Sequence, residues 1–160
     1  MDIFAFAKQM EKDSEQFYRD LVRKTGSVGL KRILTLLADE EAKHQEIVGR
    51  MSKQRVAVPD TPILDHAVNI FAEMKDRGQS LKLGETQIDL YRQAQELEER
   101  SKSFYLDKAQ ESPQPEIKEI FVQLAREEEK HSFLLENIIE FLSRPKEWLE
   151  NAEWHHLEEY

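Results

Sequence analysis

Apolar residues recur along this chain at the three- and four-residue spacing of amphipathic helices. The spacing predicts helices over 2–24, 28–53, 63–77 and 86–112, one from the prolines at 113 and 115 to about 143, and a last short one within 146–160. Asp2 suits a helix N-cap, and Gly26 and Gly78 follow two of the expected helix ends. The pattern therefore predicts an all-α fold.

The lengths of the connections predict how these helices are arranged. The joints within 2–53 and within 86–143 are short, which favours two antiparallel hairpins. The segment 54–85, with its own short helix, is long enough for a crossover along a bundle. We therefore expect a ferritin-like antiparallel four-helix bundle over 1–143, with a long crossover between its second and third long helices, and a short C-terminal helix over 144–160.

The inward-facing stripe of each long helix is apolar at both ends and polar at mid-length. Read on a heptad, the four stripes are Phe4, Ala7, Glu11, Ser14, Tyr18 and Leu21; Leu30, Leu34, Leu37, Glu41, His44, Val48 and Met51; Tyr91, Ala94, Glu98, Ser101 and Tyr105; and Ile117, Phe121, Leu124, Glu128, His131, Leu135 and Ile138. Carboxylates and imidazoles thus occupy positions that a bundle normally fills with apolar side chains.

These polar interruptions form one motif that occurs twice. Glu11 with Glu41-x-x-His44 recurs as Glu98 with Glu128-x-x-His131, at the same spacing, and the segments 7–44 and 94–131 align without gaps. Duplication of a helical hairpin is the simplest explanation. The resulting pseudo-two-fold symmetry predicts a pair of metal ions related by that axis.

Elementary electrostatics supports a metal pair. A buried carboxylate without a partner is costly, so it takes up a proton or finds a cation. Glu-x-x-His puts two ligands one turn apart on one helix face, where both reach the same centre. Two divalent ions would balance four carboxylates, and the mixture of carboxylate and imidazole suits iron, manganese or zinc better than calcium or magnesium.

Composition and charge exclude several other classes. The 160 residues are 39% hydrophobic and 34% charged, with 23 Lys+Arg against 32 Asp+Glu and a net charge of −9. This balance lacks the clustered cations that nucleic acids require, and no apolar run approaches the roughly 20 residues of a membrane span. The start of the chain lacks the features of a secretion signal. Without cysteine there is no disulfide and no Fe–S cluster, and we expect a cytoplasmic protein.

Two tyrosines and two serines accompany the six candidate ligands. Tyr18 and Tyr105 face inward, where each is either a core residue or a hydrogen-bond donor to a carboxylate of the other half. Ser14 and Ser101 are small residues beside the acids, and leave room for solvent or a small oxidant.

Other polar and aromatic residues are expected outside the site. Glu40 and Glu127 are carried off the seam by the helical turn and are predicted to be solvated, Glu15 is predicted to be an outer-face charge, and His66 a surface residue. The C-terminal residues Trp148, Trp154, His155 and His156 are expected to pack against the bundle or a second subunit, which suggests a homodimer.

The repeated pattern, including Tyr18 and Tyr105, resembles the ferritin-like di-iron carboxylate proteins, closest to the rubrerythrin branch, over about 2–143. The resemblance implies a non-haem di-iron centre. In that family Glu11 and Glu98 would be terminal ligands, Glu41 and Glu128 would bridge the irons, and His44 and His131 would each cap one iron.

The sequence also departs from the usual pattern of the proteins it resembles. Rubrerythrins typically carry a cysteine-ligated rubredoxin domain and an additional third-helix carboxylate, whereas this sequence has no cysteine and has Ser101 at the carboxylate position. Ala42 stands where bacterioferritins have their haem-binding methionine, so no haem is expected.

Together these features predict an oxidoreductase that reduces peroxide or O₂ with electrons from an external donor protein. One alternative is a ferroxidase or iron-storage protein, and another is a metal-free structural or regulatory bundle.

Overall fold

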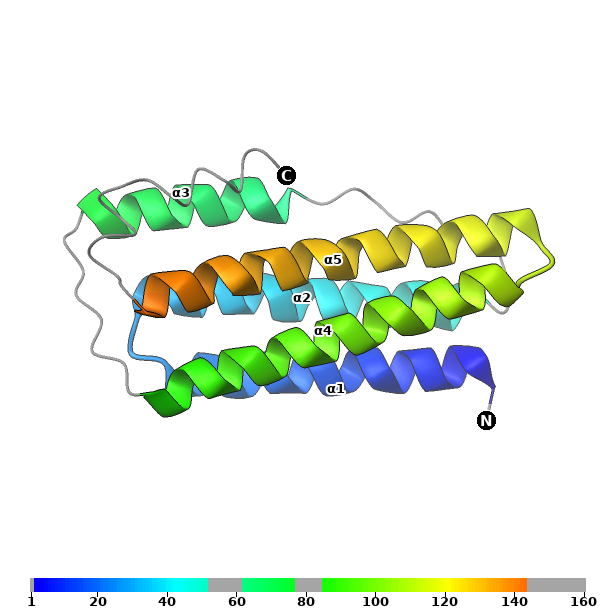
Figure 1. The fold of residues 1–160 in the computed structure, drawn as a ribbon, viewed down its shortest axis with the longest axis horizontal. Helices are drawn as coiled ribbons and strands as arrows, with labels where there is room; N and C mark the ends of the chain where they lie inside the picture. The colour runs from blue at the N-terminus through cyan, green and yellow to red at the C-terminus, as the bar shows by residue number, and fades with distance from the viewer. Residues whose placement is uncertain (1, 52–61, 77–84, 144–160) are drawn as a thin grey trace.

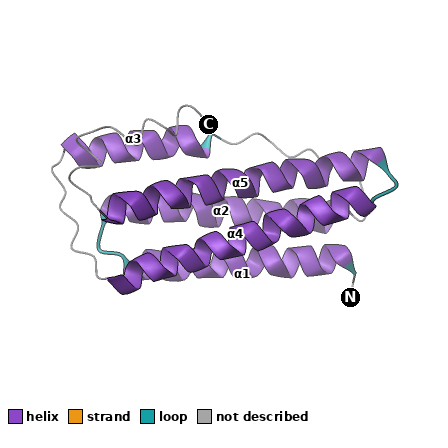
Figure 2. Ribbon diagram, viewed as in Figure 1, coloured by secondary structure: helices purple, strands orange, loops and turns teal. Residues whose placement is uncertain are grey.

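The computed structural model describes residues 2–51, 62–76 and 85–143, and every regular element within these ranges is a helix (Figure 2). The helices are α1 (Ile3–Lys24), α2 (Val28–Met51), α3 (Ile63–Asp76), α4 (Glu85–Glu111) and α5 (Pro115–Ser143). The predicted all-α class is confirmed. The helix expected within 146–160, with its tryptophans and histidines, lies outside the described residues.

Local capping explains where several of these helices begin. The Asp2 carboxylate accepts a hydrogen bond from the Phe4 N–H at 3.1 Å, and the Ser27 hydroxyl oxygen accepts one from the Leu30 N–H at 3.2 Å. Pro115 is the first residue of α5, where its missing N–H leaves no hydrogen bond unmade. The short turns between α1 and α2 and between α4 and α5 therefore connect well-defined helix ends.

The four long helices form a bundle of two antiparallel hairpins, in which α1 packs on α2 and α4 packs on α5 (Figure 1). α4 begins at the end of the bundle opposite to the end of α2, so the intervening chain crosses the length of the bundle, as predicted. α3 lies on this connection and packs against α2 and α5. Gly29 permits this approach, because a Cβ there would overlap the side chain of Met74.

Among the described residues, the core consists of two apolar clusters with a polar layer between them. The larger cluster joins α3 to the adjoining ends of the long helices, with Leu34, Phe71 and Phe141 among its fully buried side chains. The smaller one, around Phe121 and Leu124, lies towards the opposite end. Between them lie the buried glutamates and histidines of the repeated motif.

Within the part of the chain that the structure describes, none of the helices combines the length and the apolar character needed to cross a bilayer. The homodimer and the cytoplasmic location remain predictions.

Candidate metal centre

The six residues of the repeated motif converge at one level of the bundle. α1 contributes Glu11, α4 contributes Glu98, and α2 and α5 each contribute a glutamate and a histidine one turn apart. All six are at most 3% exposed. The heptad positions explain the convergence, because each residue occupies an inward-facing position at the middle of its helix.

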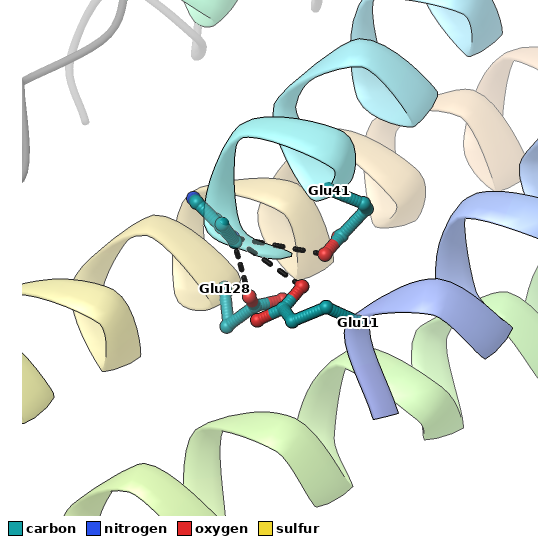
Figure 3. Close-up of side chains that lie close together, drawn as sticks. Glu11, Glu41 and Glu128 are labelled. Carbon is teal, nitrogen blue, oxygen red and sulfur yellow. Dashed lines mark hydrogen bonds and ion pairs between the residues drawn. The ribbon is translucent and has the colours of Figure 1, made fainter. Parts of the chain in front are cut away.

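Around His44, three carboxylates from three different helices point towards one imidazole nitrogen (Figure 3). The distances from its Nδ1 are 2.9 Å to Glu128 Oε1, 3.4 Å to Glu11 Oε2 and 3.7 Å to Glu41 Oε2. The Nδ1 atom of His44 thus faces three carboxylates at once.

Around His131 the arrangement is repeated. Its Nδ1 lies 3.0 Å from Glu41 Oε1 and 3.3 Å from Glu98 Oε1. The rings of His44 and His131 are nearly parallel, with centroids 5.8 Å apart and planes 9° apart. The duplication in the sequence thus appears in space as two facing half-sites.

The two half-sites overlap. Glu11, Glu41, His44 and Glu128 can direct one ligand atom each to a common point, and so can Glu41, Glu98, Glu128 and His131, with the atoms of each group within 4.8 Å of one another. Glu41 and Glu128 belong to both groups. These two carboxylates therefore join the two half-sites.

The two tyrosines connect the half-sites. The Tyr105 hydroxyl donates to Glu11 Oε1 at 2.5 Å, and the Tyr18 hydroxyl donates to Glu98 Oε1. Each tyrosine therefore holds a carboxylate of the other half. Burial and the neighbouring carboxylates raise the pKa of both phenols well above the usual value, so they remain protonated donors.

Glu11 and Glu98, the two carboxylates that each belong to only one of the two ligand groups, are ionised. Burial raises the pKa of Glu11, but the charge of His44 and hydrogen bonds within the cluster outweigh it and lower that pKa to about 2. The pKa of Glu98 is likewise about 2, because His131 outweighs the effect of burial.

The shared carboxylates and the imidazoles hold protons instead. Burial and the charges of Glu11 and Glu98 raise the pKa of Glu41 and Glu128 well above the usual value. Burial lowers the pKa of His44, but Glu11 outweighs it and raises that pKa to about 10; Glu98 similarly raises that of His131. Among these six residues, the two ionised carboxylates of Glu11 and Glu98 therefore face two protonated imidazoles.

The structure contradicts the predicted solvation of Glu40 and Glu127. They are only 7% and 3% exposed. Glu40 Oε1 lies 2.6 Å from His131 Nε2, and Glu127 lies 3.5 Å from the Lys130 ammonium. Helical geometry correctly takes both residues off the seam, but neither is solvated: Glu40 of α2 contacts His131 of α5, and Glu127 is buried beside Lys130 of its own helix. Glu40 is the site residue that the heptad pattern missed.

The remaining candidates occupy the expected surroundings. Ser14 and Ser101 are buried beside the carboxylates, and Ser101 Oγ has no hydrogen-bond partner. Glu15 is partly exposed, accepts hydrogen bonds from Arg19 of its own helix and Gln45 of α2, and belongs to neither ligand group. His66 is exposed.

Four unsatisfied oxygens test whether this layer fits metal ions. One Oε2 atom of each of the four cluster glutamates is buried without a hydrogen-bond partner. A buried oxygen without a hydrogen bond lowers the stability of the fold unless a ligand or ion binds it. Two overlapping carboxylate–histidine sets with one unfilled oxygen per carboxylate fit a pair of divalent ions, which would displace the protons and satisfy these oxygens.

The fold and this layer define a ferritin-like helical bundle with a buried carboxylate–histidine cluster suited to two metal ions. The family model described as Rubrerythrin matches residues 2–139, and the chain belongs to this family. A search of the curated proteins and a search of the solved structures gave no match.

Proposed function

We propose that the protein is a non-haem di-iron oxidoreductase that reduces hydrogen peroxide or O₂ with electrons from a separate donor protein. The observation that carries the proposal is the overlap of two ligand groups through Glu41 and Glu128. When bound, two iron ions would supply the electrons for the reduction, and the donor protein would then reduce the iron again.

The roles of the six ligands follow from their positions. We assign Glu41 and Glu128 as bridges because each belongs to both groups, and Glu11 and Glu98 as terminal ligands because each belongs to one. His44 and His131 would bind through Nδ1, the nitrogen that faces the carboxylates. Manganese or zinc would fit the same donors. Iron is proposed because the chain belongs to the Rubrerythrin family and because the proposed reduction needs a metal that changes its oxidation state.

Neighbouring residues prepare the site for this chemistry. Tyr18 and Tyr105 orient the terminal carboxylates through protonated hydroxyls. Glu40 holds the outward nitrogen of His131, which fixes the ring with Nδ1 towards the centre. The apolar clusters on either side limit access of bulk water from the bundle ends. The 160 residues contain no cysteine and so hold no thiolate-ligated redox centre, which is why the electrons are proposed to come from outside this bundle.

Peroxide turnover tests this proposal. The iron-loaded protein should consume many equivalents of hydrogen peroxide in the presence of a chemical electron donor, whereas Glu41→Ala treated identically should give only the rate of free iron. Equal rates for the two proteins would overturn the proposal. A single round of Fe²⁺ oxidation without turnover, in a particle of cage size, would instead support the storage alternative.

A further inference from the structure

A groove between α1 and α4 borders the polar layer, because its lining includes Ser14 and Ser101, which lie one helical turn from Glu11 and Glu98. It has a volume of about 750 Å³ and is lined by residues of these two helices alone. Phe6 and Phe104, whose ring centroids are 5.1 Å apart, form part of its apolar wall. Because the six ligands are almost fully buried, any ion that reaches them must pass between helices, and this groove lies where α1 and α4 carry Glu11 and Glu98.

Two buried serines line the groove next to the ligands. Ser14 follows Glu11 by one helical turn, and Ser101 follows Glu98 by one turn. They are only 2% and 1% exposed, and Ser101 Oγ has no hydrogen-bond partner. A buried hydroxyl without a partner can give its lone pairs to a passing ion.

The rim of the groove is predominantly acidic. Asp13, Glu99 and Asp107 lie on it with the single cation Arg100. Asp13 and Asp107 are exposed, and Glu99 accepts a hydrogen bond from Ser132 at 2.8 Å. An excess of carboxylates around a cleft with low-dielectric walls attracts cations and repels anions.

We propose that this α1–α4 groove is the route by which a divalent cation reaches the buried centre, attracted by the acidic rim and passed inward by the hydroxyls of Ser14 and Ser101. The inference rests on the proposed metal centre. It adds that uptake proceeds through this face, at a rate set by residues that are not ligands of the final site.

Uptake of Co²⁺ under anaerobic conditions, followed by its visible absorption after rapid mixing, tests the route. Ser103→Trp and Gln9→Trp change exposed residues that line the groove, and each new indole would obstruct it. Both should slow uptake several-fold while the final amount of bound Co²⁺ stays the same. Gln93→Trp, at an exposed position of α4 outside the groove, is the matched control and should bind at the original rate.

The rim is tested by removing its charge. The double variant Asp13→Asn/Asp107→Asn should slow uptake about tenfold at low ionic strength, with the difference shrinking as salt is added. Asp65→Asn/Asp89→Asn removes the same charge from exposed positions outside the groove and should have little effect. Uptake at the original rate in the groove variants and the rim variant would overturn the route alone. Absence of saturable Co²⁺ binding by the unmodified chain would overturn the metal centre as well.

Discussion

The middle of this bundle differs from the apolar regions on either side of it. In the apolar clusters, side chains such as Phe121 and Leu34 satisfy each other by contact and need nothing from outside the chain. In the polar layer, four carboxylates each keep one buried oxygen without a hydrogen-bond partner. The same inward-facing helical positions therefore stabilise the fold at one level of the bundle and offer ligand atoms at another.

Substitutions at the apolar level should give the largest loss of stability. Phe121→Ala removes a ring that is 1% exposed, and is expected to cost about 3–5 kcal/mol in the free energy of unfolding. Phe6→Ala, which removes a ring that is 48% exposed, should cost only about 1 kcal/mol from its contact with Phe104. Chemical denaturation measures both, and equal losses would mean that the assigned core is wrong.

Substitutions at the polar level should have the opposite sign. Glu41→Leu/Glu128→Leu replaces two buried carboxyl groups by apolar side chains of similar size, and should stabilise the metal-free protein by about 1–4 kcal/mol. The same variant should bind no metal pair, because both shared ligands are gone. Denaturation without metal and metal analysis test the two effects. A clear loss of metal-free stability would show that the carboxylates are structural.

Glu40 tests how far the polar layer extends. Removing its negative charge with Glu40→Gln should weaken metal affinity about 10- to 100-fold, because the His131 ring loses its carboxylate partner. Titration with a divalent metal measures this change, and Glu46→Gln, on an exposed position of the same helix, is the control. Unchanged metal affinity in Glu40→Gln would show that Glu40 has only a structural role, as one partner of a buried ion pair with His131.

The pH dependence of stability separates the metal-free and metal-loaded states. The pKa of His44 rises from 6.5 to about 10 on folding. Its contribution to the free energy of unfolding is therefore complete below pH 6.5 and is lost as the pH rises towards 10. The pKa of Glu11 falls from 4.5 to about 2 on folding, so its contribution to the free energy of unfolding is complete above pH 4.5 and is lost as the pH falls towards 2. The metal-free protein should therefore be most stable between these ranges.

Metal changes this dependence, because bound ions replace the protons on the imidazoles and the shared carboxylates. The gain in Tm on adding metal should therefore grow as the pH is raised above 6.5. Thermal unfolding with and without metal across this range checks the prediction, and parallel curves would contradict it.

The sequence was sufficient for most of the fold because the relevant rules are local. Heptad spacing, the Asp2 cap and Pro115 predict the helices, and the length of 54–85 predicts the crossover. The duplicated motif likewise predicts that six residues meet at one level, because each copy repeats the same register.

What the sequence did not predict depends on how helices face each other. Glu40 lies off the heptad seam, and only the packing of α2 against α5 brings it to His131. The sequence does not decide the pairing of Tyr18 with Glu98 for the same reason, because this hydrogen bond joins the two hairpins. Such contacts depend on the rotation and separation of helices, which the periodicity of a single helix does not specify.

Anaerobic titration with Fe²⁺ tests the central claim most directly. The unmodified protein should bind two Fe²⁺ ions per chain with a saturable endpoint, and Glu41→Leu/Glu128→Leu should lose that endpoint. An endpoint of one ion per chain, or no saturable binding, would contradict the assignment of two overlapping sites that share Glu41 and Glu128.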